Sequence, residues 1–162
     1  VFPIAAGDTF FATPTMAAFA AFALNALPMW RRNCGPHALK TLRQRLIEEP
    51  CVYVLFPEGT RSRTGTLQHF KSGVGMLVAE SNIPVIPCYI DGAFQAWPSN
   101  HHLPRWRRIQ ISVGKACTFE DVKNNRIGWN NIAKTIEHAV RELSASTQTG
   151  GLPDSQRESA AA

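Results

Sequence analysis

Short apolar runs alternate along the chain with stretches in which apolar residues have helical spacing. The runs predict strands at residues 1–6, 27–32, 52–55, 85–90 and 109–113. The run at 52–55 is apolar throughout and predicts a buried strand, whereas the run at 109–113 alternates and predicts a half-exposed one. Apolar residues three and four positions apart predict helices at 16–24, 36–48, 73–81 and 129–144. Strands and helices in this order are typical of an α/β domain with a mostly parallel sheet flanked by helices.

The length and composition fit one folded domain. The chain has 162 residues, of which 44% are hydrophobic and 18% are charged. Residues 147–162 are polar and end in alanines, so we expect a disordered tail after a domain at 1–146. The chain starts inside an apolar run without an initiator Met, and we expect the domain to be N-terminally incomplete. The Ala-rich helix 16–24 is too short to span a bilayer, so it lies in the core or on a membrane surface.

The net charge of +5 favours partners that carry phosphate, which include lipid headgroups, phosphorylated substrates and nucleic acid. The four cysteines form no Cys-x-x-Cys pair and have no histidines at zinc spacing. We therefore expect reduced, structural cysteines in a cytosolic compartment and no metal site.

Polar side chains concentrate in the loop after the run at 52–55. The turn and its flank contain Pro57, Glu58, Gly59, Thr60, Arg61 and Lys71. Pro57 cannot donate a strand hydrogen bond, and Gly59 admits backbone angles that other residues avoid. An arginine and a lysine between a strand end and a helix capped by Ser72 suit a bound phosphate. The alternative is an ordinary charged loop with a surface ion pair.

The order of residues in this loop resembles a known motif. Phe56-Pro57-Glu58-Gly59-Thr60-Arg61-Ser62, followed by Phe70-Lys71-x-Gly73, is similar to the third sequence block of the glycerolipid acyltransferases. The segment 85–92 is similar to their fourth block, and the two come in the family's order and spacing. The resemblance implies a glycerol-3-phosphate acyltransferase-like α/β domain. It also implies acyl transfer in phospholipid biosynthesis, from acyl-CoA or acyl-carrier protein to the hydroxyl of lysophosphatidic acid or a related lysophospholipid, without a cofactor or metal.

The resemblance assigns the phosphate of the acceptor to three cations. Arg61 would clamp it, and Lys71 and Arg31 would add charge. Arg31 lies in the run at 27–32, which resembles the family's second block, although Trp30 replaces the usual acidic residue before the arginine. The alternative is a solvated arginine pair, Arg31 and Arg32, at a strand end.

The remaining motif residues are assigned to the acceptor and to the acyl chain. Glu58 would either hold Arg61 in place or meet an acceptor hydroxyl. Gly59 would let the backbone approach the acceptor, and Thr60 would donate a hydrogen bond. Pro87 and its strand would line the acyl side of the pocket.

The family's chemistry rests on a first block, Asn-His-x-x-x-x-Asp, whose histidine takes the proton of the acceptor hydroxyl. None of the five histidines is followed, five positions later, by an aspartate. We expect this block to lie upstream of Val1 in a longer protein, and we expect the chain alone to be catalytically inactive. The alternative is a non-catalytic homologue that binds lipid phosphate.

The segment at 97–108 interleaves two tryptophans with three arginines and two histidines. Tryptophan and arginine suit the headgroup region of a membrane, which predicts a location at the cytoplasmic face, peripheral or integral through other segments. They also suit single-stranded nucleic acid, but the cations are spread along the chain and no recognition motif is visible. A loop whose tryptophans pack on the domain is the structural alternative. The pair His101-His102 lacks the further ligands that a metal site needs.

Overall fold

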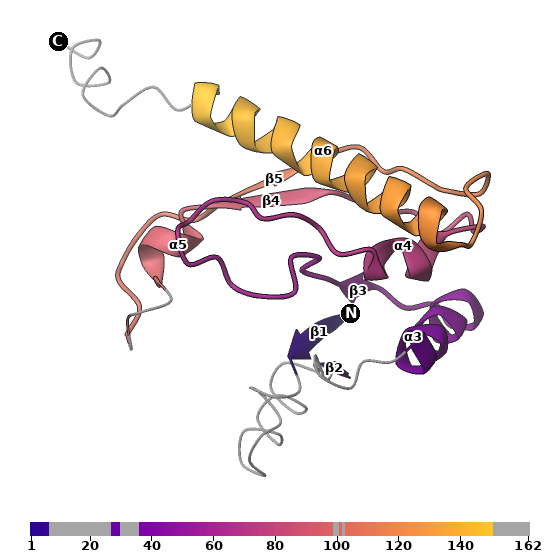
Figure 1. The fold of residues 1–162 in the computed structure, drawn as a ribbon. Coiled ribbons are helices and arrows are strands. Elements are labelled where there is room, and N and C mark those ends of the chain that lie inside the picture. The colour runs from indigo at the N-terminus through magenta and orange to yellow at the C-terminus, as the bar shows by residue number, and fades with distance from the viewer. Residues whose placement is uncertain (7–26, 30–35, 99–100, 102, 151–162) are drawn as a thin grey trace, which may run out of the picture.

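The computed structural model describes residues 1–6, 27–29, 36–98, 101 and 103–150 (Figure 1). Its elements in chain order are β1 (Phe2–Ala6), β2 (Leu27–Met29), α3 (Pro36–Glu48), β3 (Tyr53–Val54), α4 (Gly73–Val78), β4 (Cys88–Asp91), α5 (Ala93–Ala96), β5 (Gln110–Val113) and α6 (Arg126–Gly150). The alternation of strands and helices confirms the predicted α/β class.

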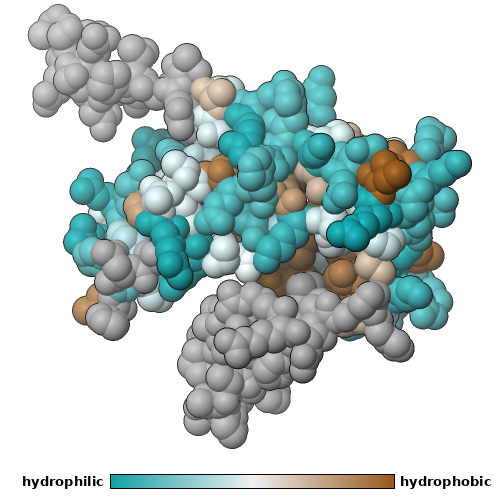
Figure 2. Space-filling view, in the orientation of Figure 1, coloured by the Kyte–Doolittle hydropathy of each residue, from teal (hydrophilic) through white to brown (hydrophobic). Residues whose placement is uncertain are grey.

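The strands of the described residues form two small sheets. In the first sheet β1 is central and runs parallel to both β2 and β3, as the α/β pattern predicts. In the second sheet β4 and β5 are antiparallel, with Tyr89 opposite Ser112 and Ile90 opposite Ile111. The long helix α6 lies across β4 and β5, and its outward surface is mostly hydrophilic (Figures 1 and 2).

The core lies where α6 packs on α4. The predicted inner face of α6 is confirmed, since Ile132, Ala133, Ile136 and Val140 are all buried. They pack with Val74, Leu77, Val78, Ala79 and Phe119. Full burial of one large aliphatic side chain contributes roughly 1.5–3 kcal/mol, so this cluster is a main source of stability. The two helices approach so closely that a Cβ on Gly75 would overlap the backbone of Trp129.

Helix α4 is shorter and differently capped than the sequence predicts. It ends at Val78 rather than at residue 81, because Ala79 is extended and Glu80 has a positive φ of 50°. Ser72 makes no capping hydrogen bond with its side chain. The other end is capped from α3, where Arg43 Nη1 donates to the carbonyls of Met76 and Leu77 at 3.4 and 3.1 Å. A cation at the C-terminus of a helix offsets the partial negative charge there.

The prediction of a buried strand at 52–55 is wrong in part. Only Tyr53 and Val54 form a strand, and the side chains of this stretch alternate between the two faces of the sheet. Leu55 packs on the core, whereas Val52 and Val54 are 58% and 41% exposed. An unbroken apolar run does not show which face of a strand the helices cover.

Other boundaries also moved. Helix α6 spans Arg126–Gly150 rather than the predicted residues 129–144, and helix α5 was not predicted. The strand predicted at 85–90 begins only at Cys88, and Val85 forms an isolated bridge with Cys117. The predicted helix at 16–24 and the tail after 150 lie outside the described residues. No helix of the described ranges is both long enough and apolar enough to cross a membrane.

Candidate functional site

The loop between β3 and α4, which we call the motif loop (residues 56–71), contains the acyltransferase-like motif. It turns sharply at Gly59, whose φ of +70° favours glycine, and the Gly59 N–H donates to the Phe56 carbonyl at 3.0 Å. The loop closes where the Lys71 N–H donates to the Pro57 carbonyl at 2.9 Å. The two ends of the motif are thus held together by backbone hydrogen bonds.

The side chain of Lys71 lies directly against the turn. A Cβ built on Gly59 would be 2.7 Å from the Lys71 ammonium nitrogen and 3.0 Å from its Cε. Gly59 therefore serves two needs, a positive φ and the space that Lys71 occupies. The structure brings these two predicted site residues together, although 12 positions separate them in the sequence.

Glu58 is bound by the backbone of its own loop. Its Oε2 accepts a hydrogen bond from the Gln68 N–H at 2.9 Å, which ties the first half of the loop to the second. Among the described residues, neither Arg61 nor Lys71 forms an ion pair with a carboxylate. Among the described residues, the Glu58 carboxylate is thus bound by the Gln68 backbone and forms no ion pair with Arg61, and its expected roles toward Arg61 or an acceptor hydroxyl stay predictions.

Arg61 and Thr60 are both exposed at the outer edge of the loop. The Arg61 guanidinium carbon lies 5.9 Å from the centre of the Trp97 ring, within the range of a cation–π contact. Phe94 of α5 lies beside Gly65, where a Cβ would be 2.8 Å from its ring. Two aromatic residues from the α5 region thus flank the motif loop.

Helix α6 holds the second half of the loop through Glu137. Its Oε2 accepts from the Phe70 N–H at 2.9 Å, and its Oε1 lies 3.1 Å from His69 Nδ1 and 2.9 Å from Arg141 Nη2. The Glu137 side chain is only 13% exposed. Burial alone would raise the pKa of this carboxyl, but the hydrogen bonds from Phe70, Arg141 and His69 outweigh it and lower the pKa. We call Glu137 with these three partners the Glu137 clasp.

A comparison with known protein families identifies the family of the chain that contains the motif loop. Residues 1–91, more than half of the chain, match the family model described as Acyltransferase. This chain belongs to the acyltransferase family. The match includes β1, the complete motif loop and β4, and it ends before α5.

The individual relatives of this acyltransferase domain are also named as acyltransferases. It is 28% identical over 120 residues to the 1-acyl-sn-glycerol-3-phosphate acyltransferase of Cocos nucifera, covering 74% of this chain and 36% of the relative. It is 37% identical over 76 residues to the same-named protein of Limnanthes douglasii, covering 47% of this chain and 26% of the relative. The chain therefore spans about a third or less of these two relatives.

A solved structure shows the fold. The 1-acyl-sn-glycerophosphate (LPA) acyltransferase of Thermotoga maritima superimposes with a TM-score of 0.65 at 18% identity, over 91% of this chain and 56% of that one. The structural match extends well past residue 91, so the fold of the acyltransferase domain includes the segments after the family motifs.

Two further predicted site residues, Arg31 and Pro87, come from outside the motif loop in the sequence. Arg31 lies outside the described residues. Pro87 is buried beside β4, where its carbonyl accepts from the Gly114 N–H at 2.8 Å, and its neighbours Ile86 and Cys88 are exposed instead. Any surface that this strand offers to an acyl chain would thus come from the residues flanking Pro87.

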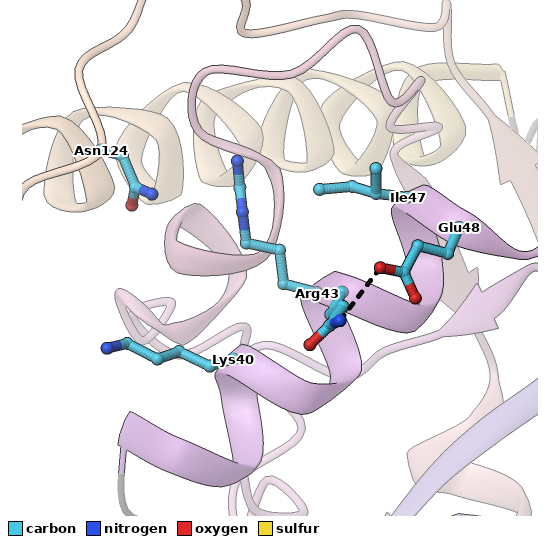
Figure 3. Close-up of a pocket in the computed structure, with 6 residues that line it drawn as sticks. Lys40, Arg43, Ile47, Glu48 and Asn124 are labelled. Atoms are coloured by element: carbon cyan, nitrogen blue, oxygen red, sulfur yellow. Dashed lines mark hydrogen bonds between the residues drawn. The ribbon is translucent and has the colours of Figure 1, made fainter.

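The acyltransferase domain also has a hollow of about 300 Å³ away from the motif loop (Figure 3). It is lined by Lys40, Arg43, Gln44, Ile47, Glu48 and Asn124. The Arg43 guanidinium there already binds the end of α4, and Gln44 donates to Glu48 at 3.0 Å. In the described ranges, no three His, Cys, Asp or Glu side chains gather to hold a metal ion.

Sequence reasoning missed the Glu137 clasp and the aromatic flank of the loop. Glu137 lies on the polar side of an amphipathic helix, where a glutamate usually faces solvent. Phe94 and Trp97 lie 29 and 36 residues after Gly65 and Arg61, respectively. Nothing in the local pattern pairs residues at such separations.

Proposed function

We propose that this chain is the acceptor-binding part of an enzyme that acylates lysophosphatidic acid or a related lysophospholipid. In that reaction the acceptor hydroxyl attacks the carbonyl of an acyl-CoA or acyl-carrier-protein thioester, an ester bond forms and the thiol leaves. The proton of the hydroxyl passes to a base. The sequence contains no His-x-x-x-x-Asp pair, so we propose that residues outside these 162 supply the base.

One observation carries the proposal. Arg61 and Lys71 lie on one short loop without a carboxylate partner among the described residues, while the loop's own carboxylate, Glu58, is engaged by Gln68. Two such cations beside a glycine turn suit the phosphate of the acceptor. The names of the relatives support lysophosphatidate as the acceptor.

The place of action belongs to the same proposal. A lysophospholipid acceptor enters from a lipid surface, so we place the enzyme at the cytoplasmic face of a membrane. No further cofactor is required by this chemistry, because the thioester supplies both the acyl group and its leaving group.

The first experiment compares Arg61→Ala with Arg63→Ala, an exposed arginine on the same loop. Binding of a short-chain lysophosphatidate below its micelle concentration would be measured by calorimetry, beside the uncharged monoacylglycerol. Loss of one charge-assisted contact costs roughly 1.5–3 kcal/mol, so Arg61→Ala should weaken lysophosphatidate binding between about tenfold and about a hundredfold.

The control and the neutral ligand sharpen the outcome. Arg63→Ala should bind lysophosphatidate nearly as well as the unchanged chain, and monoacylglycerol binding should not respond to Arg61→Ala. An equal loss of lysophosphatidate affinity in both arginine variants would mean that only the net charge of the loop matters. Unchanged lysophosphatidate affinity in Arg61→Ala would remove the phosphate role and with it the proposed function.

A further inference from the structure

The segment between α5 and β5 exposes apolar side chains that proteins usually bury. Trp106 is fully exposed, and Leu103 is 77% exposed. Tryptophan is mostly buried in folded domains because its ring offers a large apolar area. The segment projects from one side of the molecule, opposite the side where α6 begins (Figure 1). Side chains placed in this way indicate a partner surface.

The charge of the region identifies the kind of partner. Between Asp91 and Glu120 the sequence contains no acidic residue, but it contains the four cations Arg105, Arg107, Arg108 and Lys115. The three arginines are exposed. A stretch of one sign attracts an anionic surface, and arginine beside tryptophan matches phosphate at headgroup depth.

The neighbouring strand β5 also exposes apolar side chains. Ser112 of β5 hydrogen-bonds Thr147 of α6, so Ile111 and Val113 lie on the opposite face, where they are 61% and 65% exposed. Nucleic-acid bases stack on aromatic rings, whereas aliphatic side chains offer them no such platform. Exposed leucine, isoleucine and valine on the same stretch of chain as the tryptophan therefore favour lipid over nucleic acid.

The segment is fastened next to the motif loop. Trp97 lies under Arg61 and donates from Nε1 to the His101 carbonyl at 2.9 Å. The Arg105 N–H returns to the Ala96 carbonyl at the end of α5, at 2.7 Å. The segment that carries the exposed tryptophan and arginines is thus anchored at its start beside Arg61 of the motif loop.

We propose that Leu103, Arg105, Trp106, Arg107 and Arg108 form an interfacial patch that binds an anionic lipid bilayer. Trp106 and Leu103 enter the headgroup region, and the arginines bind lipid phosphates. The inference rests on the proposed function, because a lipid acceptor is what gives the motif loop a reason to lie at this surface.

The test uses two double variants that each remove one exposed cation and one exposed apolar side chain. Trp106→Ala with Arg107→Ala changes the interfacial patch. Arg126→Ala with Ile127→Ala changes the start of α6, where Ile127 is 73% exposed. Arg107 is preferred to Arg105, because Arg105 Nη2 lies 2.6 Å from His101 Nε2 and its loss would alter the segment itself.

Sedimentation with phosphatidylcholine vesicles, with and without phosphatidylglycerol, measures the partition of each variant. One arginine at an anionic surface contributes about fivefold, and loss of the tryptophan adds to this, so the patch variant should bind more than about tenfold more weakly. The α6 variant should follow the unchanged chain. Added salt should weaken the binding.

Three outcomes would overturn the patch: equal binding of both double variants, indifference to phosphatidylglycerol, or patch-dependent binding of single-stranded RNA without vesicle binding. Short-chain lysophosphatidate binding, measured on the same proteins, separates the two proposals. If the patch variant keeps its vesicle binding while Arg61→Ala loses the monomeric acceptor, the patch alone is wrong. If the patch variant loses vesicles while Arg61→Ala binds the acceptor normally, the proposed function is wrong and the patch stands.

Discussion

The motif loop and the interfacial patch both present arginines, but they are built in opposite ways. The motif loop is tied at several points, by Lys71 to Pro57, by Glu58 to Gln68 and by the Glu137 clasp to α6. The patch lies on a segment, residues 103–110, in which every residue is exposed. The family match covers the loop and ends before the patch.

This difference teaches how each region recognises phosphate. A single small acceptor must be held in one orientation, which requires cations on a fixed backbone. A bilayer offers many phosphates in no fixed arrangement, so exposed cations around an apolar anchor suffice. Changes to the loop should therefore act through geometry, whereas changes to the patch should act through charge and apolar area.

The largest effect on the loop is expected from Glu137→Gln. The change leaves the Phe70 N–H with a weaker acceptor and removes the charge that binds Arg141, which should lower the free energy of unfolding by roughly 1–3 kcal/mol. Urea unfolding measures this loss. Glu142→Gln on the same helix is the control, because the His138–Glu142 pair is well exposed and should contribute little.

The same variant tests the pH dependence of the loop. The pKa of Glu137 lies below its ordinary value of 4.5 in the folded chain, so the stabilisation is complete above that value and is lost as the pH falls through the folded pKa. The unchanged chain should lose stability in acid more steeply than Glu137→Gln. Parallel acid profiles of the two proteins would show that the clasp carries no charge-dependent stability.

A smaller effect is expected from Gly59→Ala. An alanine in this left-handed conformation costs roughly 1–2 kcal/mol, and its methyl group would also displace the Lys71 ammonium. Gly73→Ala is the matched control, because Gly73 has no positive φ and a Cβ there would meet only Leu39 at an ordinary 3.6 Å. Urea unfolding should show a loss for the first variant and little change for the second.

Lysophosphatidate binding adds a second measurement of Gly59→Ala. Because Lys71 must move away from the turn, acceptor affinity should fall as well as stability. In a Lys71→Ala background Gly59→Ala should cost stability only, since the side chain that it displaces is gone. An equal loss of acceptor affinity in both backgrounds would show that Gly59→Ala does not act through the position of Lys71.

The sequence was sufficient for the fold class and for most elements, because those depend on local patterns. Helix α3 has the predicted bounds, and Ile132, Ile136 and Val140 face the core as their spacing predicts. The sequence was insufficient where burial depends on a distant partner. It could not show that the side chains of Val52 and Val54 are exposed. Nor could it show that the backbones of Gly75 and Trp129 approach closely.

The motif loop was located from its residue order, and its internal contacts were predicted less well. The seven residues from Phe56 to Ser62 identify the site because their order is specific. The partner of Glu58 is a backbone N–H, which every residue except proline offers, so no side-chain pattern could point to Gln68. The roles of Thr60, Arg31 and Pro87 in binding substrate stay predictions.

The smallest effect is expected at Trp97, which contacts Arg61 and precedes the interfacial patch in the chain. An exposed cation–π contact contributes roughly 0.5–1 kcal/mol, so Trp97→Ala should weaken short-chain lysophosphatidate binding by about two- to fivefold. Trp97→Phe should keep most of the affinity, because it retains an aromatic face for the guanidinium. Calorimetry with the monomeric acceptor measures both, free of any contribution from the patch.

A double-mutant experiment distinguishes a positioning role of Trp97 from a packing role. If Trp97 acts only by orienting Arg61, then Trp97→Ala should have no further effect on acceptor affinity once Arg61 is alanine. Losses that simply add would mean that Trp97 supports the segment rather than the arginine. In that case the contact between Trp97 and Arg61 would not contribute to acceptor binding.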